Sequence, residues 1–331
     1  MNTDILHRVR EKLIDNNENI TLEEARELAL IRNKEQLLET IFTSSKVTEK
    51  YHPSGIYLCS IISARTGACP EDCSFCSQSI YSESPLEAQQ WIEPEKILES
   101  ARKAETSGAS EFCVVTSGRG PNKRTFNKVL ESVRLIRAHT NLSVGCSLGL
   151  LSEEQAALLA EAGVKRYNHN LETSRSYFPR ICSTHRYEDR LRTARLVKQH
   201  GMELCCGGIL GVGETGEQRL ELAFELRELE PEVIPVNLLN PRQGTPLGGR
   251  APLHPLEALK YIAIFRIILP GSILLCAGGR ESVLQDYQPW ALFAGANALI
   301  TGDYLTTKGN LPSKDIQMIK EMGLPVLKYK Q

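Results

Sequence analysis

Three cysteines lie close together in the chain, in a CxxxCxxC run formed by Cys69, Cys73 and Cys76. Three thiolates at this spacing can wrap one metal centre, and thiolate ligands select zinc or an iron–sulfur cluster. A structural zinc normally takes four protein ligands, usually as two separated pairs. Three local cysteines with no adjacent fourth better suit a four-iron cubane whose last iron stays open for a substrate. The alternatives are a zinc knuckle and scattered thiols that share no metal.

The elements that would position this run alternate regularly. Strand-like runs cover residues 56–63, 111–116, 142–148, 165–168, 203–206, 233–237, 273–276 and 298–300. Helix-like runs cover residues 94–104, 126–138, 153–162, 187–200, 217–229, 255–268, 281–293 and 315–322. This alternation predicts a (β/α)8 TIM-type barrel over residues 51–331, with an open doubly wound sheet as the alternative. The cysteine run would then follow the first strand, at the end of the barrel that carries active sites.

Residues 1–50 have a different pattern. Thr21 and Glu24 form a capping box, and apolar residues at helical spacing follow it. We expect a helical N-terminal extension that leads into the barrel.

Composition excludes several classes of partner. The 331 residues carry 39 Lys+Arg and 40 Asp+Glu, a formal charge of -1, so we expect no nucleic acid partner. The best apolar stretch, residues 261–269, contains Arg266 and is far shorter than the ~20 residues that cross a bilayer. The start of the chain lacks the apolar core of a signal peptide. We expect a cytoplasmic protein with no membrane partner.

Most of the remaining cysteines fall in the predicted strands: Cys59, Cys113, Cys146, Cys205, Cys206 and Cys276, with only Cys182 outside. Alternate residues of a barrel strand point inward, so the neighbours Cys205 and Cys206 must face opposite ways. A lone strand cysteine is usually a small core residue. Five strands that each offer one favour a second cluster inside the barrel.

The cysteine run, with Phe75 before its last member, resembles the signature of the radical S-adenosylmethionine (SAM) enzymes. The resemblance implies a 4Fe-4S cluster whose open iron binds SAM. Electron transfer then cleaves SAM to methionine and a 5′-deoxyadenosyl radical that abstracts hydrogen. No side chain is expected to act as acid or base, because unactivated C–H bonds are too strong for that chemistry.

Further blocks narrow the resemblance, which runs from about residue 50 onward. They are TGACPEDC at 66–73, YNHNLETS at 167–174, GGILGVGET at 207–215, PVNLL at 235–239, GTPL at 244–247 and AGGRE at 277–281. In this order they are similar to the biotin synthase family. That family inserts sulfur into dethiobiotin to form biotin; two hydrogens are abstracted by 5′-deoxyadenosyl radicals, and an auxiliary iron–sulfur cluster donates the sulfur. The resemblance also implies a flavodoxin or ferredoxin-type electron donor and a homodimer.

The resemblance also implies roles for individual residues. Asn170 and Glu172 would bind the ribose of SAM, Arg190 its carboxylate, and the backbone around Thr116 and Ser117 its amino group, with Phe75 beside the cofactor. Asn168 and Asn237 would bind the ureido ring of dethiobiotin, since amides donate and accept without bringing charge. Cys113, Cys146 and Cys205 would hold the auxiliary cluster.

Departures from the family pattern concern that auxiliary cluster. Leu275 stands where many relatives have an arginine ligand, and Cys59 replaces a nearby serine. Losing the arginine while gaining thiols predicts a larger, four-iron cluster in place of a two-iron one. Cys276 is the first choice for its fourth ligand, then Cys59, then Cys206. Glu172 replaces a familiar aspartate, a change that we expect to be conservative.

Two other functions stay open. One is a different radical SAM reaction, such as that of a maturase, on a related barrel. The other is a non-catalytic iron–sulfur scaffold, which would have no use for Arg190, Asn170 and Glu172. A GxGxxG match at 211–216 follows the fifth strand and not the first, so we expect a structural turn there and no dinucleotide site.

Overall fold

The computed structural model of the chain describes residues 3–327. Its helices are α1 Thr3–Arg10, η1 Glu11–Asn16, α2 Leu22–Ala29, α3 Lys34–Tyr51, α4 Pro94–Thr106, α5 Lys123–His139, α6 Glu153–Ala162, η2 Phe178–Arg180, α7 Tyr187–Gln199, α8 Gly216–Leu229, α9 Pro255–Ile268, α10 Arg280–Leu284, η3 Gln285–Tyr287, α11 Gln288–Phe293 and α12 Pro312–Glu321. Its strands are β1 Ile56–Arg65, β2 Glu111–Thr116, β3 Ser143–Ser147, β4 Arg166–Asn168, β5 Glu203–Cys205, β6 Gly208–Leu210, β7 Val233–Leu238, β8 Ile273–Cys276, β9 Ala298–Ile300 and β10 Val326–Leu327.

The strands close into a parallel barrel. They follow the order β1-β2-β3-β4-β5-β7-β8-β9, and β9 returns to β1 with Ala298 opposite Tyr57. β5 and β6 both pair with β7, at successive positions along it. Together they occupy one of the eight strand positions of the barrel. The (β/α)8 TIM-type fold is confirmed, and the pairing of β9 with β1 rules out the open sheet.

Alternate residues of each strand divide between two environments. On β2, Phe112 and Val114 belong to the hydrophobic cluster between the strands and the helices, which we call the outer layer. Glu111 and Val115, on the other face of the strand, line cavities inside the barrel. The same parity holds on β8, where Leu274 lies in the outer layer and Leu275 in a separate interior cluster.

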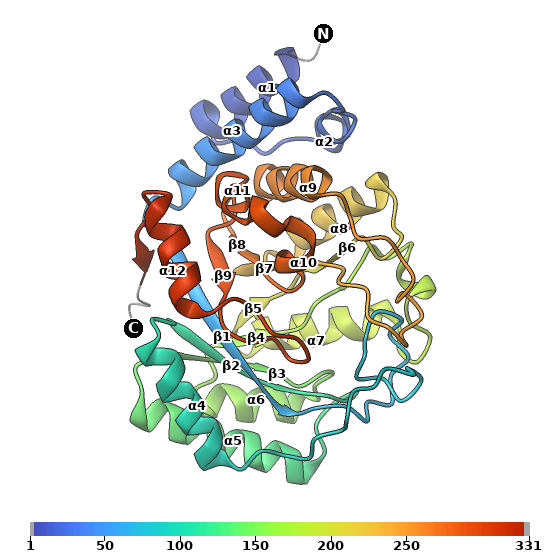
Figure 1. Ribbon diagram of the computed structural model, residues 1–331, viewed down its shortest axis with the longest axis vertical. Helices are drawn as coiled ribbons and strands as arrows, with labels where there is room; N and C mark the ends of the chain where they lie inside the picture. Colours follow the sequence, from blue (N-terminus) through green and yellow to red (C-terminus); the bar gives the residue numbers. More distant parts are fainter. Residues whose placement is uncertain (1–2, 328–331) are drawn as a thin grey trace.

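The N-terminal helices α1, α2 and α3 lie on one side of the barrel, next to α9 and α11 (Figure 1). The capping box of Thr21 and Glu24 is present at the start of α2. Lys260 of α9 donates to the backbone carbonyl of Ala29 at 3.3 Å, and Ser44 of α3 donates to that of Ala294 at 2.9 Å. The extension shares the outer layer with the barrel, so the division into residues 1–50 and 51–331 stays a prediction.

Two local predictions are wrong. The single helix expected over 281–293 is broken into α10, η3 and α11, because Gln285 adopts a φ of 49° and Pro289 has no N–H to continue a helix. The strand expected over 203–206 ends at Cys205, and β6 was not foreseen. Gly207 lies so close to β7 that a Cβ would stand 2.1 Å from the carbonyl oxygen of Pro235. The strand position shared by β5 and β6 is therefore interrupted at Gly207, where only glycine fits.

Candidate functional site

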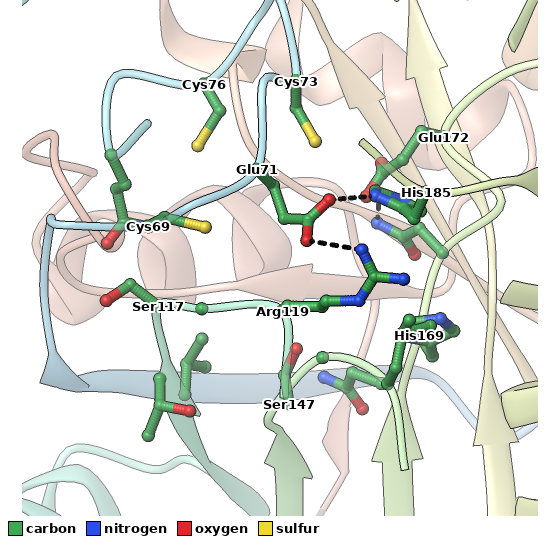
Figure 2. A pocket seen from close by; sticks show the side chains of 18 of the residues that line it. Cys69, Glu71, Cys73, Cys76, Ser117, Arg119, Ser147, His169, Glu172 and His185 are labelled. Carbon is green, nitrogen blue, oxygen red and sulfur yellow. Dashed lines mark hydrogen bonds and ion pairs between the residues drawn. The ribbon is translucent and has the colours of Figure 1, made fainter. Parts of the chain in front are cut away.

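The loop after β1 brings the three clustered cysteines to one cavity, which we call the mouth cavity. Cys69, Cys73 and Cys76 all line it, and Figure 2 shows their sulfurs pointing into it. The loop is pinned to itself by backbone hydrogen bonds, for example from Cys76 N to Cys73 O at 2.9 Å and from Ile80 N to Cys69 O at 2.9 Å. All three thiols are free of disulfides. Their convergence fits a cubane cluster with three thiolate ligands.

Glu71, within the cysteine run, ties the loop to the opposite wall. Its carboxylate accepts hydrogen bonds from Nδ1 of His185 and from the hydroxyl of Thr184, and it pairs with Arg119 at 3.4 Å (Figure 2). Burial alone would raise the pKa of Glu71, but the hydrogen bonds from Thr184 and His185 lower it on balance. Thr184 and His185 lie more than 110 residues from Glu71 along the chain and were not foreseen from the sequence.

Asp72 makes a second tie to the same segment. Its carboxylate accepts from the backbone N–H of Ser183 at 2.9 Å and of Thr184 at 3.2 Å. Burial would raise the pKa of Asp72, but hydrogen bonds from Ser183, Cys182 and Thr184 hold it well below its usual value. Cys182 also lies with its sulfur 3.9 Å from that of Cys73. It lines the back of the cysteine loop, a place that its sequence position did not reveal.

Arg190, on α7, is held in a fixed orientation at the wall of the mouth cavity. Its Nε donates to Nε2 of His185 at 2.9 Å, and its Nη1 donates to the backbone carbonyl of Asn170 at 2.8 Å. Nη1 also lies 3.4 Å from the carboxylate of Glu172. A chain of contacts therefore runs from Glu71 through His185 to Arg190. It presents the guanidinium, a good partner for a carboxylate, to the cavity.

Asn170 and Glu172 follow β4 and line the same cavity. Asn170 Oδ1 accepts from the N–H of Gly207 at 3.1 Å, and its Nδ2 lies 3.4 Å from Oε2 of Glu172. Glu172 has a φ of 70°, and its carbonyl accepts from Ile209 N at 2.7 Å, which holds this strained turn in place. Burial raises the pKa of Glu172, and Arg190 opposes that shift.

Phe75, Thr116 and Ser117 complete the wall that the sequence predicted. Thr116 ends β2, and the hydroxyl of Ser117 donates to the carbonyl of Gly67 at 2.6 Å. The end of β2 is thereby fastened to the start of the cysteine loop. The structure brings all six residues predicted for SAM to the cavity that holds the three thiols.

A second cavity, the inner cavity, continues from the first into the barrel. The two share Phe75, Cys76, Asn168 and Asn170. Asn168 Nδ2 lies 3.4 Å from the sulfur of Cys113, while its buried Oδ1 has no hydrogen-bond partner among the described residues. Asn237 Oδ1 accepts from Gly278 N at 3.0 Å, and its Nδ2 donates to Gly208 O at 3.2 Å. Both predicted amides therefore reach this space.

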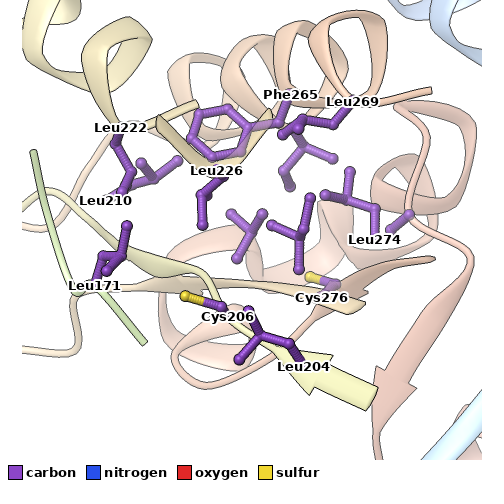
Figure 3. Packing of buried hydrophobic residues seen from close by; sticks show 14 of the residues in the cluster. Leu171, Leu204, Cys206, Leu210, Leu222, Leu226, Phe265, Leu269, Leu274 and Cys276 are labelled. Atoms are coloured by element: carbon purple, nitrogen blue, oxygen red, sulfur yellow. The ribbon is translucent and has the colours of Figure 1, made fainter. Parts of the chain in front are cut away.

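The strand cysteines divide evenly between the two faces of the barrel wall. Cys59 and Cys205 line a small cavity in the barrel interior, and Cys113 lies against Gly145 and Glu111, on that same interior face. Cys146, Cys206 and Cys276 belong to the outer layer. Figure 3 shows Cys206 and Cys276 among leucines and Phe265 of that layer. The structure thus places Cys59, Cys113 and Cys205 on the interior face of the barrel wall.

This arrangement does not bring Cys146 and Cys276 to Cys113, as the predicted ligand set required. Gly145 takes the interior position on β3, where a Cβ would lie 3.5 Å from the sulfur of Cys113. Leu275 takes the interior position on β8. Both predicted ligands miss the interior by one residue, which on a strand means the opposite face.

Comparisons with known proteins agree with this geometry. The model of the Radical SAM superfamily matches residues 64–226, and that of the Biotin and Thiamin Synthesis associated domain matches residues 235–325. The biotin synthase of Carboxydothermus hydrogenoformans is 47% identical, over 92% of this chain and 94% of that protein. The biotin synthase of Pelotomaculum thermopropionicum is 44% identical, over 93% and 96%.

The chain belongs to the biotin synthase family. It is therefore a radical SAM enzyme that inserts sulfur into its substrate. Methylornithine synthase, a solved structure, superimposes with a TM-score of 0.84 over 98% of this chain and 97% of its own, at 21% identity. At that identity the likeness supports the barrel fold alone.

Two further features concern the GxGxxG loop and the question of membrane-spanning helices. The carboxylate of Glu214 accepts from the N–H of Gly211 at 2.7 Å and of Gly213 at 2.9 Å, so the amides of the GxGxxG loop are bound by the protein's own acid. No helix within residues 3–327 is both long and apolar enough to cross a membrane.

Proposed function

We propose that this chain converts dethiobiotin to biotin, with SAM bound in the mouth cavity and dethiobiotin in the inner cavity. One observation carries the proposal. The cavity with the three loop thiols opens into a second cavity that reaches Cys205 in the barrel interior, and the two share Asn168 and Asn170. A radical formed at the mouth would have a direct path to a substrate between the two sets of thiols.

For SAM, we assign Cys69, Cys73 and Cys76 to a 4Fe-4S cluster that supplies the electron for SAM cleavage when bound. The protein's own part is to fix the polar groups of SAM. Arg190, oriented by His185 and by Asn170 O, would pair with the carboxylate. Carbonyls at Thr116 and Ser117, at the end of β2, would accept from the amino group.

The ribose and adenine ends of SAM would meet the remaining wall. Asn170 and Glu172 lie within 3.4 Å of each other and can together accept from and donate to the ribose hydroxyls. Phe75 lines both cavities and would exclude water between cofactor and substrate. The longer reach of Glu172, relative to the aspartate of relatives, leaves this role intact.

For dethiobiotin, we assign the ureido ring to Asn168 and Asn237. The unpartnered Oδ1 of Asn168 is an acceptor that a ureido N–H would satisfy. Asn237 already uses one lone pair and one N–H on the backbone, which fixes its amide and leaves a second of each for a ligand. A neutral cyclic urea suits neutral amides in an interior site.

For the sulfur source, we propose an auxiliary iron–sulfur cluster in the barrel interior, of four irons and not two. Leu275, in the interior cluster, offers no ligand where an arginine would complete a two-iron centre. Thiols from β1, β2 and β5 face this space instead. Three thiolates suit a cubane with one open iron, by the same reasoning as for the mouth.

Other properties follow the family. We propose a flavodoxin or ferredoxin-type reductant, a homodimer, and the cytoplasm as the compartment. All ten cysteines are free of disulfides, which is typical of proteins in a reducing compartment and supports this proposal.

An anaerobic assay tests the function. Reconstituted protein would be mixed with reductant, SAM and dethiobiotin, and 5′-deoxyadenosine and biotin would be followed by mass spectrometry. We expect both products from the wild type. If 5′-deoxyadenosine formed without biotin, the radical chemistry would stand and the substrate would be wrong. If neither formed with iron fully loaded, the scaffold hypothesis would replace the enzyme.

A further inference from the structure

We infer that Cys59, Cys113 and Cys205 are the protein thiolates of the cluster in the barrel interior, and that Cys146, Cys206 and Cys276 are not ligands. The inference rests on the proposed function, which places a cluster there. It replaces the ligand set that the resemblance implied, because strand parity and not the count of cysteines decides which thiols can meet.

The three interior thiols come from β1, β2 and β5 and lie on the interior face of the barrel wall. Cys59, on β1, lies 3.6 Å from Oε1 of Glu111, and a Cβ on Gly145 would lie 3.4 Å from that same oxygen and 3.5 Å from the sulfur of Cys113. Cys59 and Cys205 line one small cavity. Glu111, which also lines that cavity, therefore lies between Cys59 and the wall that carries Cys113.

The interior also offers room. Gly145 leaves open the space that a side chain on β3 would fill beside Cys113. Arg166, on β4, lines the same small cavity as Cys59 and Cys205 and is ion-paired with Glu111 and Glu203. The absence of a side chain at Gly145 is therefore the feature of this wall that suits a bound group.

The outer thiols are committed elsewhere. Cys146 lies in the same cluster as Val144 and Leu148 of its own segment, and it is fully buried. Cys206 and Cys276 pack against the helices that cover the barrel (Figure 3). Turning any of these sulfurs inward would reverse the face of a whole strand, which would place its aliphatic neighbours in the interior.

The test isolates the interior cluster from the mouth cluster. A Cys69→Ala/Cys73→Ala/Cys76→Ala background removes the mouth ligands, so that iron and acid-labile sulfide bound after anaerobic reconstitution report the interior alone. In this background Cys59→Ala, Cys113→Ala and Cys205→Ala would each be compared with Cys146→Ala and Cys276→Ala. Near-UV and far-UV circular dichroism would confirm that each variant is folded.

We expect iron and visible absorbance to fall at least severalfold in the three interior variants and to stay near the background level in the two outer variants. Iron lost from folded Cys146→Ala or Cys276→Ala, or iron retained by Cys59→Ala, would overturn the ligand assignment alone. A background that binds no iron, while the wild type binds one cluster and cleaves SAM, would overturn the interior cluster itself and with it the proposed sulfur source.

Discussion

The mouth of the barrel and its interior are lined by different kinds of side chain. The mouth is a network of charged and polar groups, with Glu71, His185, Arg190 and Glu172 in successive contact. The interior around Cys205 is lined by aliphatic side chains such as Val233 and Leu275. The mouth offers oriented charged groups, whereas the interior offers thiols beside aliphatic side chains and the ion pair of Arg166 with Glu111.

The difference follows from what each region would hold. SAM is a charged, soluble molecule, so its site needs preformed partners for its carboxylate and hydroxyls. A cluster is held by bonds to sulfur, so its site needs thiols from several strands more than it needs charged partners. Burial raises the pKa of Cys205 to about 12, so the unloaded thiols are neutral and must lose protons when iron binds. The comparison predicts separable failures in the two regions.

The largest effect should come from the mouth thiols. Cys73→Ala should abolish SAM cleavage, a loss well beyond the roughly 10–100-fold that outer-shell changes cost at metal sites. The interior cluster should remain, because its thiols lie elsewhere. Cys182→Ala is the matched control, since its sulfur lies 3.9 Å from that of Cys73 yet is not an assigned ligand. Formation of 5′-deoxyadenosine, measured beside iron content, would break the comparison if both variants failed alike.

The charged network should control SAM and leave dethiobiotin alone. Arg190→Lys keeps the positive charge but loses the two parallel N–H donors of the guanidinium. The KM for SAM should therefore rise roughly 10–100-fold, the effect of losing a buried hydrogen bond to a charged group. His185→Ala frees the guanidinium and should raise the same KM about tenfold, with a smaller change in kcat. Arg192→Lys, exposed on the same helix, is the control. Equal effects on the KM of dethiobiotin would contradict the division of the two cavities.

The amides should behave in the reverse way. Asn168→Ala removes an interior acceptor, so dethiobiotin should bind up to about tenfold more weakly, the scale of one or two neutral hydrogen bonds. Asn237→Ala should have a similar effect. The dissociation constant for SAM, measured without dethiobiotin, should stay unchanged. A matching loss of SAM affinity would show that the two sites are not distinct.

The last prediction concerns the stability of the fold in acid, an effect that should arise in neither the mouth nor the interior. Burial, and then the charge of Arg266, lower the pKa of His52 to about 4, although its ring bonds to Pro270 O. The neutral form is favoured in the folded state, so this stability is complete above pH 6.5 and is lost as the pH falls toward 4. The loss should be on the order of 2 kcal/mol. Urea unfolding between pH 4 and 7 should show it in wild type and not in His52→Gln.

Much of the fold and of the mouth was predictable from the sequence. The alternation of strands and helices predicted the barrel, and the spacing of Cys69, Cys73 and Cys76 predicted that they would share one cavity, because both signals are short-range. The contacts of Glu71 with His185 and Thr184 could not be foreseen, since they join segments that meet only in three dimensions. The break between β5 and β6 was not foreseen for a related reason. Gly207 is required there because β7, a later segment of the chain, approaches closely in the fold.

The interior was predicted less well because successive residues of a strand face opposite sides of the barrel wall. A cysteine in a strand can be recognised from sequence, but its face depends on a register that an error of one residue reverses. Cys146, which the resemblance implied, and Cys276, the first choice for the fourth ligand, lie on the outer face, and Gly145 and Leu275 take the interior positions beside them. Cys59, ranked behind Cys276, lies in the interior with Cys205.

The most direct test of the account follows sulfur from the interior to the product. Protein reconstituted with iron and ³⁴S-sulfide, then freed of unbound sulfide, would react anaerobically with SAM, reductant and dethiobiotin, beside a folded Cys113→Ala variant. We predict ³⁴S-labelled biotin from the wild type, and SAM cleavage without biotin from the variant. Unlabelled biotin from the wild type, or labelled biotin from the variant, would contradict an interior cluster as the sulfur donor.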